Sequence, residues 1–420
     1  MSLRSSPLWA NRRFRLLLSA YGLSTVGDAF LPVSLAAGIL LAGGSPTDLG
    51  IPLAAAVLAR LVTTLMGGAA ADRWPPVRVM VTANAVRAVA NGAMAILFAF
   101  GNTDPWALAM AMAVASVGGS FYGPAAVVVK QAIVEPEQRG DANASYSLAS
   151  NIGATAGPIL AGLTVAVLGA SVGMFLNALV CVVATLLVVG IRVTRTVEPP
   201  QSFLRQLSGG LKVITSRSWL WLGIGSATIY HLAAGVAIVL TQTIAVTQLG
   251  GADALGIINA SAGFGSVAGA LIAMRTRAKR ILVSAWLPLA VTSAATVAYV
   301  WPGALIPVIV ATAFGGVSMV YFGVAWDTYL QNTVPPASIG RVYSWDILSS
   351  MAMMPLGNLI AGPLSATLGV GPVLIAASIV MTVFCLTPLL ARATWTARWE
   401  DRDVADSVDR NQNGQRRVEG

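Results

Sequence analysis

Residues 142–191 read ANASYSLASNIGATAGPILAGLTVAVLGASVGMFLNALVCVVATLLVVGI, and this stretch contains no Asp, Glu, Lys or Arg. A membrane-spanning helix needs about 20 predominantly apolar residues. The stretch is therefore long enough for two spans joined by a tight turn centred on Gly169. Asp141 precedes it and Arg192 follows it, so charge returns at its two ends but not at its central turn. The pattern predicts a helical hairpin that crosses a bilayer twice.

The loops elsewhere in the chain also alternate between those with Lys or Arg and those without. They cluster in every second gap between the apolar runs, and the gaps between these clusters contain none. The basic segments are residues 4–15, 73–78, 130–139, 192–217 and 275–280, Arg341, and the chain from Arg392 onward. Basic loops of membrane proteins stay on the cytoplasmic side. The pattern predicts a multi-pass protein of the cell inner (cytoplasmic) membrane with both termini in the cytoplasm.

The composition excludes an ordinary soluble protein. Only 10% of the residues are charged and 56% are hydrophobic, whereas soluble proteins have about 25% charged residues. A net charge of +9 could indicate nucleic-acid binding, but the cations are spread over seven segments and not gathered in one patch. We therefore expect the lipid bilayer, and no nucleic acid, as a partner. Cys181 and Cys385 lie within apolar runs without metal-ligand spacing, so we expect buried small side chains and no metal site.

Twelve apolar segments are long enough to cross a bilayer as helices. They are residues 16–42, 49–71, 78–101, 106–131, 143–168, 171–191, 219–248, 254–274, 281–300, 303–331, 342–367 and 371–391. An even number of spans places both termini on one side, in agreement with the charge pattern. The sequence predicts an all-α membrane protein with twelve transmembrane helices.

Polar segments divide the chain into four parts. Residues 194–217 form the only long polar gap, and their amphipathic pattern predicts a cytoplasmic linker that lies on the inner membrane surface. The end of the chain is charged and rich in Asn and Gln, which is typical of disorder. We predict an N-terminal six-helix bundle at 1–193, the linker at 194–217, a C-terminal six-helix bundle at 218–394 and a disordered cytoplasmic tail at 395–420.

The two halves repeat short motifs in the same order. Leu49-Gly50-Ile51 recurs as Leu255-Gly256-Ile257, Phe121-Tyr122-Gly123 recurs as Tyr321-Phe322-Gly323, and Gly157-Pro158 recurs as Gly362-Pro363. Two parallel repeats on either side of a central pathway are typical of secondary transporters that work by a rocking motion. We therefore expect two pseudo-symmetric six-helix bundles.

The loop after the second apolar segment reads Gly68-Ala-Ala-Ala-Asp72-Arg73-Trp-Pro-Pro-Val-Arg78. It resembles the signature between the second and third helices of the major facilitator superfamily, and the resemblance covers about residues 10–395. It implies the major facilitator fold and an inner gate in which an acid caps a helix and arginines pair with acids of the inner loops. The residues expected in this gate are Gly68, Asp72, Arg73, Arg78 and Arg341. The second half has Ala273 where the gate acid would fall, so we expect a one-sided gate.

A second motif, in the fifth span, favours export. Gly153, Gly157, Pro158 and Gly162 occur at the spacing Gly-x-x-x-Gly-Pro-x-x-Ala-Gly, which resembles the antiporter motif of drug-exporting members of the superfamily. The glycines permit close helix contact and the proline interrupts the backbone hydrogen bonds, giving a bendable face where the halves meet. Ordinary small-residue packing is the alternative interpretation. The family's arginine in the fourth helix is missing, because residues 106–129 contain no Arg.

Within the superfamily, the chain resembles the enterobactin-exporter and macrolide-efflux-like branch of bacterial permeases. Ser24-x-x-Gly27-Asp28 in the first span and Gly340-Arg341-Val342 after the tenth carry this resemblance.

Four ionisable residues within the apolar segments are candidates for coupling protons or binding substrate. They are Asp28, Arg60, Asp327 and His231. Ionisable side chains in hydrocarbon are costly and usually functional. We expect Asp28 to carry the coupling proton or to pair with a cationic substrate, with Arg60 as its partner; the alternative is a carboxylate that only caps or bonds a neighbouring helix. Arg87, in the third span, is expected to make a structural contact with another helix or with backbone carbonyls.

Aromatic residues at equivalent positions of the two halves suggest a substrate cavity. Stacking and cation–π contacts would suit a flat or amphipathic molecule. The candidate lining residues are Phe121, Tyr122, Trp221, Tyr230, Tyr321, Phe322 and Trp326. Helix packing or contact with lipid is the alternative role for these residues.

The sequence contains no nucleotide-binding Gly-x-x-x-x-Gly-Lys-Ser/Thr loop, no catalytic cluster and no channel filter. We expect a transporter and not an enzyme, with no cofactor. The leading interpretation is a monomeric, proton-coupled exporter of a small organic compound such as a drug, antibiotic or siderophore. A nutrient importer or facilitator, or a membrane sensor or partner protein without transport activity, are the alternatives.

Overall fold

A computed structural model describes residues 7–193, 213–276, 278–301, 303, 305–334 and 336–398. Within these residues the regular structure is helical. Most of the predicted linker, up to residue 212, and the predicted tail from residue 399 lie outside the described residues. The domain boundaries therefore stay predictions.

The N-terminal half contains six α-helices and two short 3₁₀ turns among the described residues. They are η2 (Pro7–Ala10), α1 (Arg12–Asp28), α2 (Phe30–Leu40), α3 (Pro46–Arg73), α4 (Pro76–Ala99), α5 (Pro105–Ile133), η3 (Pro136–Gln138) and α6 (Arg139–Val188). Local capping explains where some of them begin. The Asn11 side chain accepts hydrogen bonds from the backbone N–H groups of Arg13 and Phe14 at 3.0 and 3.3 Å, and Asp104 accepts one from Trp106 N–H at 3.0 Å before Pro105 opens α5.

The C-terminal half repeats this organisation. Its described elements are α8 (Ser218–Gln248), α9 (Gly251–Arg275), α10 (Ile281–Ala295), η4 (Thr296–Val300), α11 (Leu305–Thr333), α12 (Pro336–Ala352), α13 (Met354–Leu368), α14 (Val370–Leu386), η5 (Thr387–Leu390) and α15 (Arg392–Thr396). The prediction of an all-helical membrane protein is confirmed.

Eleven helices in the described part of the chain are long and apolar enough to span a membrane. One of them, α6, runs for 50 residues and turns back on itself at Gly169, whose φ of 86° and ψ of 167° are not helical. Its two limbs correspond to the predicted spans 143–168 and 171–191. A left-handed φ favours glycine because a Cβ atom would clash with the backbone, and the equivalent turn of the second half also uses a glycine, Gly369, with φ 87°. The number of twelve crossings and the cytoplasmic position of the termini remain predictions.

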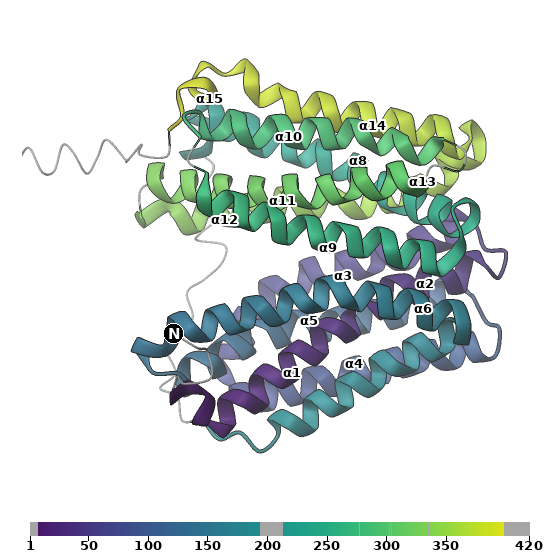
Figure 1. The fold of residues 1–420 in the computed structure, drawn as a ribbon, viewed down its shortest axis with the longest axis vertical. Coiled ribbons are helices and arrows are strands. Elements are labelled where there is room, and N and C mark those ends of the chain that lie inside the picture. Colours follow the sequence, from purple (N-terminus) through teal and green to yellow (C-terminus); the bar gives the residue numbers. More distant parts are fainter. Residues whose placement is uncertain are drawn as a thin grey trace, which may run out of the picture.

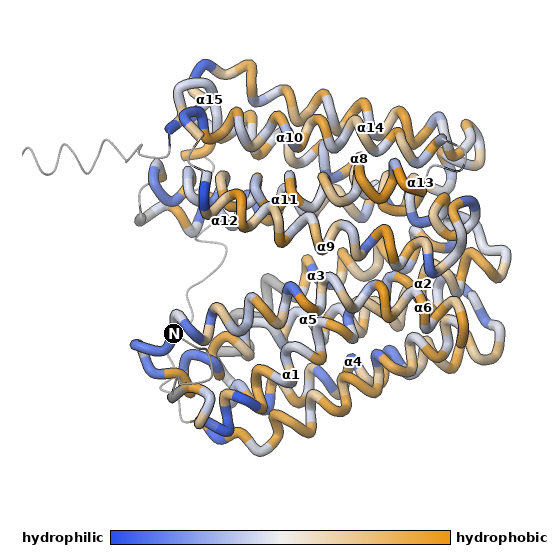
Figure 2. The backbone as a smooth tube through the Cα atoms, in the orientation of Figure 1, coloured by the Kyte–Doolittle hydropathy of each residue, from blue (hydrophilic) through white to orange (hydrophobic). Residues whose placement is uncertain are grey.

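The two halves form two helical bundles whose axes converge at one end and diverge at the other (Figure 1). The converging end carries turns without Lys or Arg, such as Gly43–Asp48 and Gly250–Asp253, and the diverging end carries the Arg-rich start of α1 and α15. Figure 2 shows hydrophobic positions along most of each helix and hydrophilic positions mainly at the helix ends. The predicted cytoplasmic position of the basic ends would make the diverging end the inner side of the membrane.

Small residues make the contact between the bundles at the converging end. A Cβ atom added at Gly256 of α9 would lie 2.6 Å from the Pro158 carbonyl oxygen and 2.8 Å from the Gly162 Cα atom of α6. Around this contact, Leu35 and Leu49 from the first half share one buried cluster with residues of α8 and α9. Helices in lipid associate largely by van der Waals packing, which small residues permit at close range.

Replacing Gly256 with valine should disrupt this contact. Because the clashing atoms belong to the backbone, they cannot move aside as a flexible side chain would, and we expect a loss of about 1–3 kcal/mol in unfolding free energy. Denaturant unfolding of the purified protein measures it. Gly323→Val is the matched control, because no atom lies within 4 Å of a Cβ added at Gly323 of α11. Equal stability of the two variants would contradict the tight contact.

Candidate functional site

A salt bridge between Asp28 and Arg87 lies inside the N-terminal bundle. Asp28 is the last residue of α1 and Arg87 lies on α4, and the Arg87 Nη2 atom donates a hydrogen bond to the Asp28 carboxylate. The Arg87 side chain is 9% exposed, whereas that of Asp28 is 54% exposed. Arg87 is thus enclosed by protein, and the acid keeps one side open.

Neighbouring residues hold Arg87 in this orientation. The Asn84 side-chain oxygen, one turn earlier on α4, accepts a hydrogen bond from Arg87 Nη1 at 3.4 Å. Gly118 of α5 leaves room for the arginine stem, since an added Cβ atom would lie 2.7 Å from Arg87 Cγ. The orientation of the guanidinium therefore depends on residues from two helices in addition to Asp28.

Uncharged polar groups surround the ion pair. Asn91 lies one turn beyond Arg87, and its amide contacts the Cys181 sulfur of α6 at 3.9 Å. Tyr122 of α5 is buried, and the charges of Arg87 and Asp28 both act on its hydroxyl group. Asn84, Asn91 and Asn177 each leave one buried amide atom without a hydrogen-bond partner. Such groups are costly away from water, so three of them beside one ion pair call for an explanation.

The expected pairing of Asp28 with Arg60 is corrected by the structure. Arg60 of α3 is exposed and acts on Asp28 only through longer-range electrostatics, whereas Arg87 makes the ion pair. The expectation of an Arg60 partner depends on consecutive helices of the chain being neighbours at this depth. Instead α1 packs mainly on α6, and α4 packs on both α5 and α6, so the long Arg87 side chain reaches the end of α1. The prediction that Arg87 contacts another helix is confirmed.

A cavity of about 800 Å³ lies between the bundles at their diverging end. One wall belongs to α1, α5 and α6 and is aromatic and polar; the other belongs to α9 and is apolar. The lining residues are Tyr21, Tyr122, Gly123, Ala126, Val127, Lys130, Asn143, Tyr146, Ser147, Ser150 and Asn151 on the first wall, and Val267, Ala270, Leu271 and Met274 on the second. Tyr122 therefore belongs both to this cavity and to the surroundings of the ion pair.

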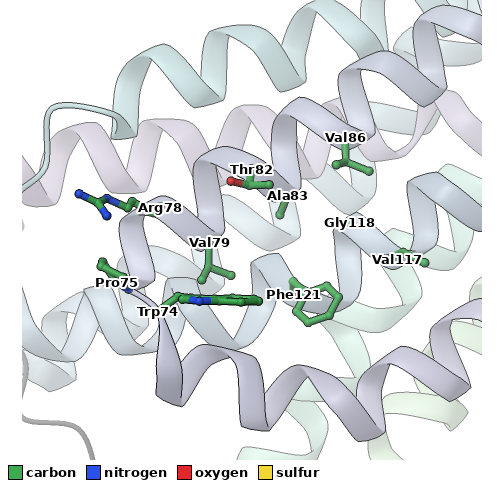
Figure 3. Close-up of a pocket in the computed structure, with 10 residues that line it drawn as sticks. All are labelled: Trp74, Pro75, Arg78, Val79, Thr82, Ala83, Val86, Val117, Gly118 and Phe121. Carbon is green, nitrogen blue, oxygen red and sulfur yellow. The ribbon is translucent and has the colours of Figure 1, made fainter.

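The seven predicted aromatic residues do not form one wall. Only Tyr122 lines the cavity between the bundles. Phe121, the preceding residue, faces a separate groove of about 460 Å³ between α4 and α5, together with Trp74 and Val79 (Figure 3). Adjacent residues of a helix point about 100° apart, so the two aromatic rings reach different spaces.

The C-terminal aromatics pack within their own bundle, which is a second correction. Phe322 and Trp326 stack with ring centroids 5.9 Å apart, and Trp286 lies edge-on to both. Tyr321 is buried and its hydroxyl is 3.0 Å from that of Ser284, whereas Trp221 is 49% exposed. Packing, the alternative role considered for these residues, accounts for Tyr321, Phe322 and Trp326.

Tyr230 and His231 line a third cavity, of about 450 Å³, within the C-terminal half. The His231 Nδ1 atom lies 2.7 Å from the Ala227 carbonyl oxygen, one turn earlier on α8. A proton on this nitrogen would donate to that oxygen and leave Nε2 as an acceptor. Several hydroxyl groups share the cavity, including those of Thr241, Thr292 and Thr312.

The acids of the C-terminal half are separate from the cavity between the bundles. Asp327 is exposed on α11. Asp346 of α12 accepts a hydrogen bond from the Trp326 indole nitrogen at 3.2 Å, a contact that the sequence did not predict. The one feature of the sequence that points to Asp346 is its position as an acid within an apolar segment, five residues beyond Arg341. The coupling role expected for Asp327 stays a prediction.

The predicted inner gate is described only in part. The backbone of Gly68, Asp72 and Arg73 belongs to α3, and their side chains lie outside the described residues. Arg78 is exposed near the start of α4 and borders the groove of Figure 3, and Arg341 is exposed on α12. The gate therefore stays a prediction.

The Gly-Pro motif of α6 faces two helices at once. A Cβ atom at Gly157 would lie 2.7 Å from the Ala29 Cβ atom, and a Cβ atom at Gly153 would lie 2.6 Å from the Thr25 Cβ atom near the end of α1. Gly162 and Pro158 instead contact Gly256 of the other bundle. The motif thus connects the helix that carries Asp28 to the contact between the bundles.

Comparison with known proteins identifies the family. The model of the Major Facilitator Superfamily matches residues 17–357. The chain belongs to this superfamily. It is a multi-pass membrane transporter, and both the predicted resemblance and the predicted fold are confirmed.

Two kinds of relative are efflux proteins. The chain is 26% identical to the multidrug efflux pump Tap of Mycolicibacterium fortuitum over 391 residues, covering 87% of this chain and 92% of Tap. It is 21% identical to macrolide efflux protein A of Streptococcus pyogenes over 333 residues, covering 77% and 82% of the two chains. The predicted likeness to the efflux branch of the superfamily is confirmed.

Solved structures share the fold at low identity. The nucleoside transporter NupG aligns with a TM-score of 0.70 at 10% identity, over 90% of this chain and 98% of that one. A bacterial homologue of the human lysosomal transporter Spinster, in an inward-facing and occupied conformation, aligns with a TM-score of 0.69 at 13% identity, over 95% and 99%.

Replacing Arg87 with methionine should destabilise the protein more than replacing both members of the ion pair. The single change leaves the Asp28 carboxylate without its partner, and we expect a loss of about 2 kcal/mol that Asp28→Asn partly restores in the double variant. Unfolding of the purified single and double variants measures the coupling. Arg60→Met, which removes a cation outside the pair, is the control. Purely additive effects would contradict a stabilising pair.

Proposed function

We propose that this protein is a proton-coupled exporter of small organic compounds in the cell inner membrane. It takes up substrate from the inner side and releases it outside in exchange for protons. The observation that carries the proposal is the cavity between the bundles, whose wall residue Tyr122 also lies within electrostatic range of the Asp28–Arg87 ion pair. The efflux function of Tap and of macrolide efflux protein A supports the outward direction.

The proposed cycle begins with substrate in the cavity. The aromatic wall of α1, α5 and α6 and the apolar wall of α9 together suit an amphipathic molecule. The cavity lies where the bundles diverge, so substrate enters from the side of the basic helix ends. A ligand shifts the balance between two conformations only if it binds one of them more tightly. The closure of both walls around the substrate provides this difference in affinity.

Asp28 is the proposed proton carrier. Its carboxylate has one side open, while Arg87 holds the other. Protonation of Asp28 removes its negative charge and weakens the ion pair that joins Arg87 to the end of α1. The end of α1 packs on Gly153 and Gly157 of α6, and the same motif contacts α9. A change in the ion pair can therefore reach the contact between the bundles through one continuous stretch of packed helix.

Transport into inverted membrane vesicles under an imposed pH gradient tests the proposal with a panel of drugs, antibiotics and siderophores. We expect gradient-dependent accumulation of at least one compound. Asp28→Asn should lower the gradient-driven rate about tenfold or more while exchange without a gradient continues, because the step lost is proton transfer. Asp48→Asn is the matched control: this partly buried acid, in the first turn of α3, accepts a hydrogen bond from the Ser45 hydroxyl.

Three outcomes would contradict parts of the proposal. Accumulation that does not depend on the pH gradient would exclude proton antiport. Full gradient-driven transport by Asp28→Asn would exclude the coupling role of Asp28. Accumulation only in right-side-out vesicles would favour the nutrient importer.

A further inference from the structure

Lys130 is the single charged residue among those that line the cavity between the bundles. It lies in the last turn of α5, three residues before Ile133 ends the helix. A lysine near a helix end commonly extends its ammonium group to the membrane surface. In this protein the side chain is instead partly buried in the cavity wall.

Two neighbours from α6 hold the ammonium group there. The Lys130 Nζ atom donates a hydrogen bond to the Asn143 side-chain oxygen at 2.9 Å and lies 4.8 Å from the centre of the Tyr146 ring. Tyr146 is itself packed against Tyr21, with ring centroids 4.7 Å apart. An ammonium group has three N–H donors. Asn143 takes one and the ring face attracts another, which leaves a donor for a molecule in the cavity.

No acid is among the described residues that line the cavity. Asp28, whose charge acts on the wall residue Tyr122, is bonded to Arg87 and also interacts electrostatically with Arg60. Asp346 is bonded to Trp326, and neither it nor Asp327 or Asp141 lines the cavity. The opposite wall is formed by four apolar residues of α9. Within the described part of the chain, a substrate in the cavity therefore faces one positive group and no carboxylate in the lining.

We propose that Lys130 sets the charge preference of the transporter: the cavity accepts amphipathic compounds with an anionic or neutral, hydrogen-bond-accepting head at Lys130, and disfavours cations. The apolar body of such a compound lies against α9. This inference rests on the proposed function, since it names the class of compound that the exporter carries. Like charges at short range in a partly desolvated cavity repel, and a carboxylate in the same place gains a charge-assisted hydrogen bond.

Two xanthene dyes of similar size and opposite charge provide the test. Fluorescein is anionic and rhodamine 123 is cationic at neutral pH, and the fluorescence polarisation of each reports its binding to the purified protein. We expect fluorescein to bind at least about fivefold more tightly than rhodamine 123. Lys130→Gln should reduce this ratio about fivefold, Lys130→Glu should reverse the preference, and Lys130→Arg should retain it.

The controls separate charge from folding. Lys279→Gln removes an exposed cation away from the cavity and should leave the ratio unchanged. Retention of the preference by Lys130→Arg would show that any cation at this position of the folded cavity wall is sufficient for the charge preference. Equal binding of the two dyes, tighter binding of rhodamine 123, binding of neither dye, or an unchanged ratio in Lys130→Gln would each overturn the inference. Binding requires no transport, so a failure of the charge preference is distinct from a failure of export in the vesicle experiment.

Discussion

The lack of water in the hydrocarbon core is the constraint on which this structure depends. Every backbone N–H and C=O group must find a partner within the protein, and helices provide it within one segment. The hydroxyl side chains follow the same rule. Thr63 donates to the Ala59 carbonyl oxygen at 2.6 Å and Thr243 to that of Val239 at 2.8 Å. Charged groups cannot be satisfied in this way, and Asp28 finds its partner on another helix.

The same environment decides where the bundles meet. Lipid offers no hydrophobic force that favours one apolar helix face over another, so close packing of small residues selects the contact. Gly162 and Gly256 lie at the converging end, and Tyr21 and Tyr146 lie at the diverging end. The size of the side chains along α6 and its neighbours therefore gives one closed end and one end with a cavity. The proposed exchange between inward and outward states would have to break the glycine contact and close the tyrosine-lined space.

The two halves share a fold but differ in the chemistry of their interiors. Cys181 and Cys385 are buried at corresponding places near the ends of α6 and α14. Around Cys181 lie amides and the Asp28–Arg87 pair, whereas Cys385 lies 3.8 Å from the Ser293 hydroxyl in a bundle of hydroxyl and aromatic groups. Lys130 and tyrosines on the N-terminal wall and apolar residues of α9 on the C-terminal wall make the cavity between the bundles chemically one-sided. A compound between the bundles would meet Lys130 and tyrosines on one face and methyl groups on the other.

The membrane class, the helical segments and the family follow from the sequence by itself. Apolar length, sorted cations and short motifs are local signals, because the bilayer imposes the same requirements on every segment that crosses it. The turn at Gly169 and the role of Gly153 to Gly162 as a packing face were predictable for this reason. Contacts between side chains were less predictable. Arg87 and not Arg60 pairs with Asp28, and Phe121 and Tyr122 face different spaces. Only the tertiary structure decides such contacts, because they depend on the rotation of each helix about its axis and on which helices pack together. The sequence does not show this rotation, since a helix that contacts both lipid and protein has apolar residues on all its sides.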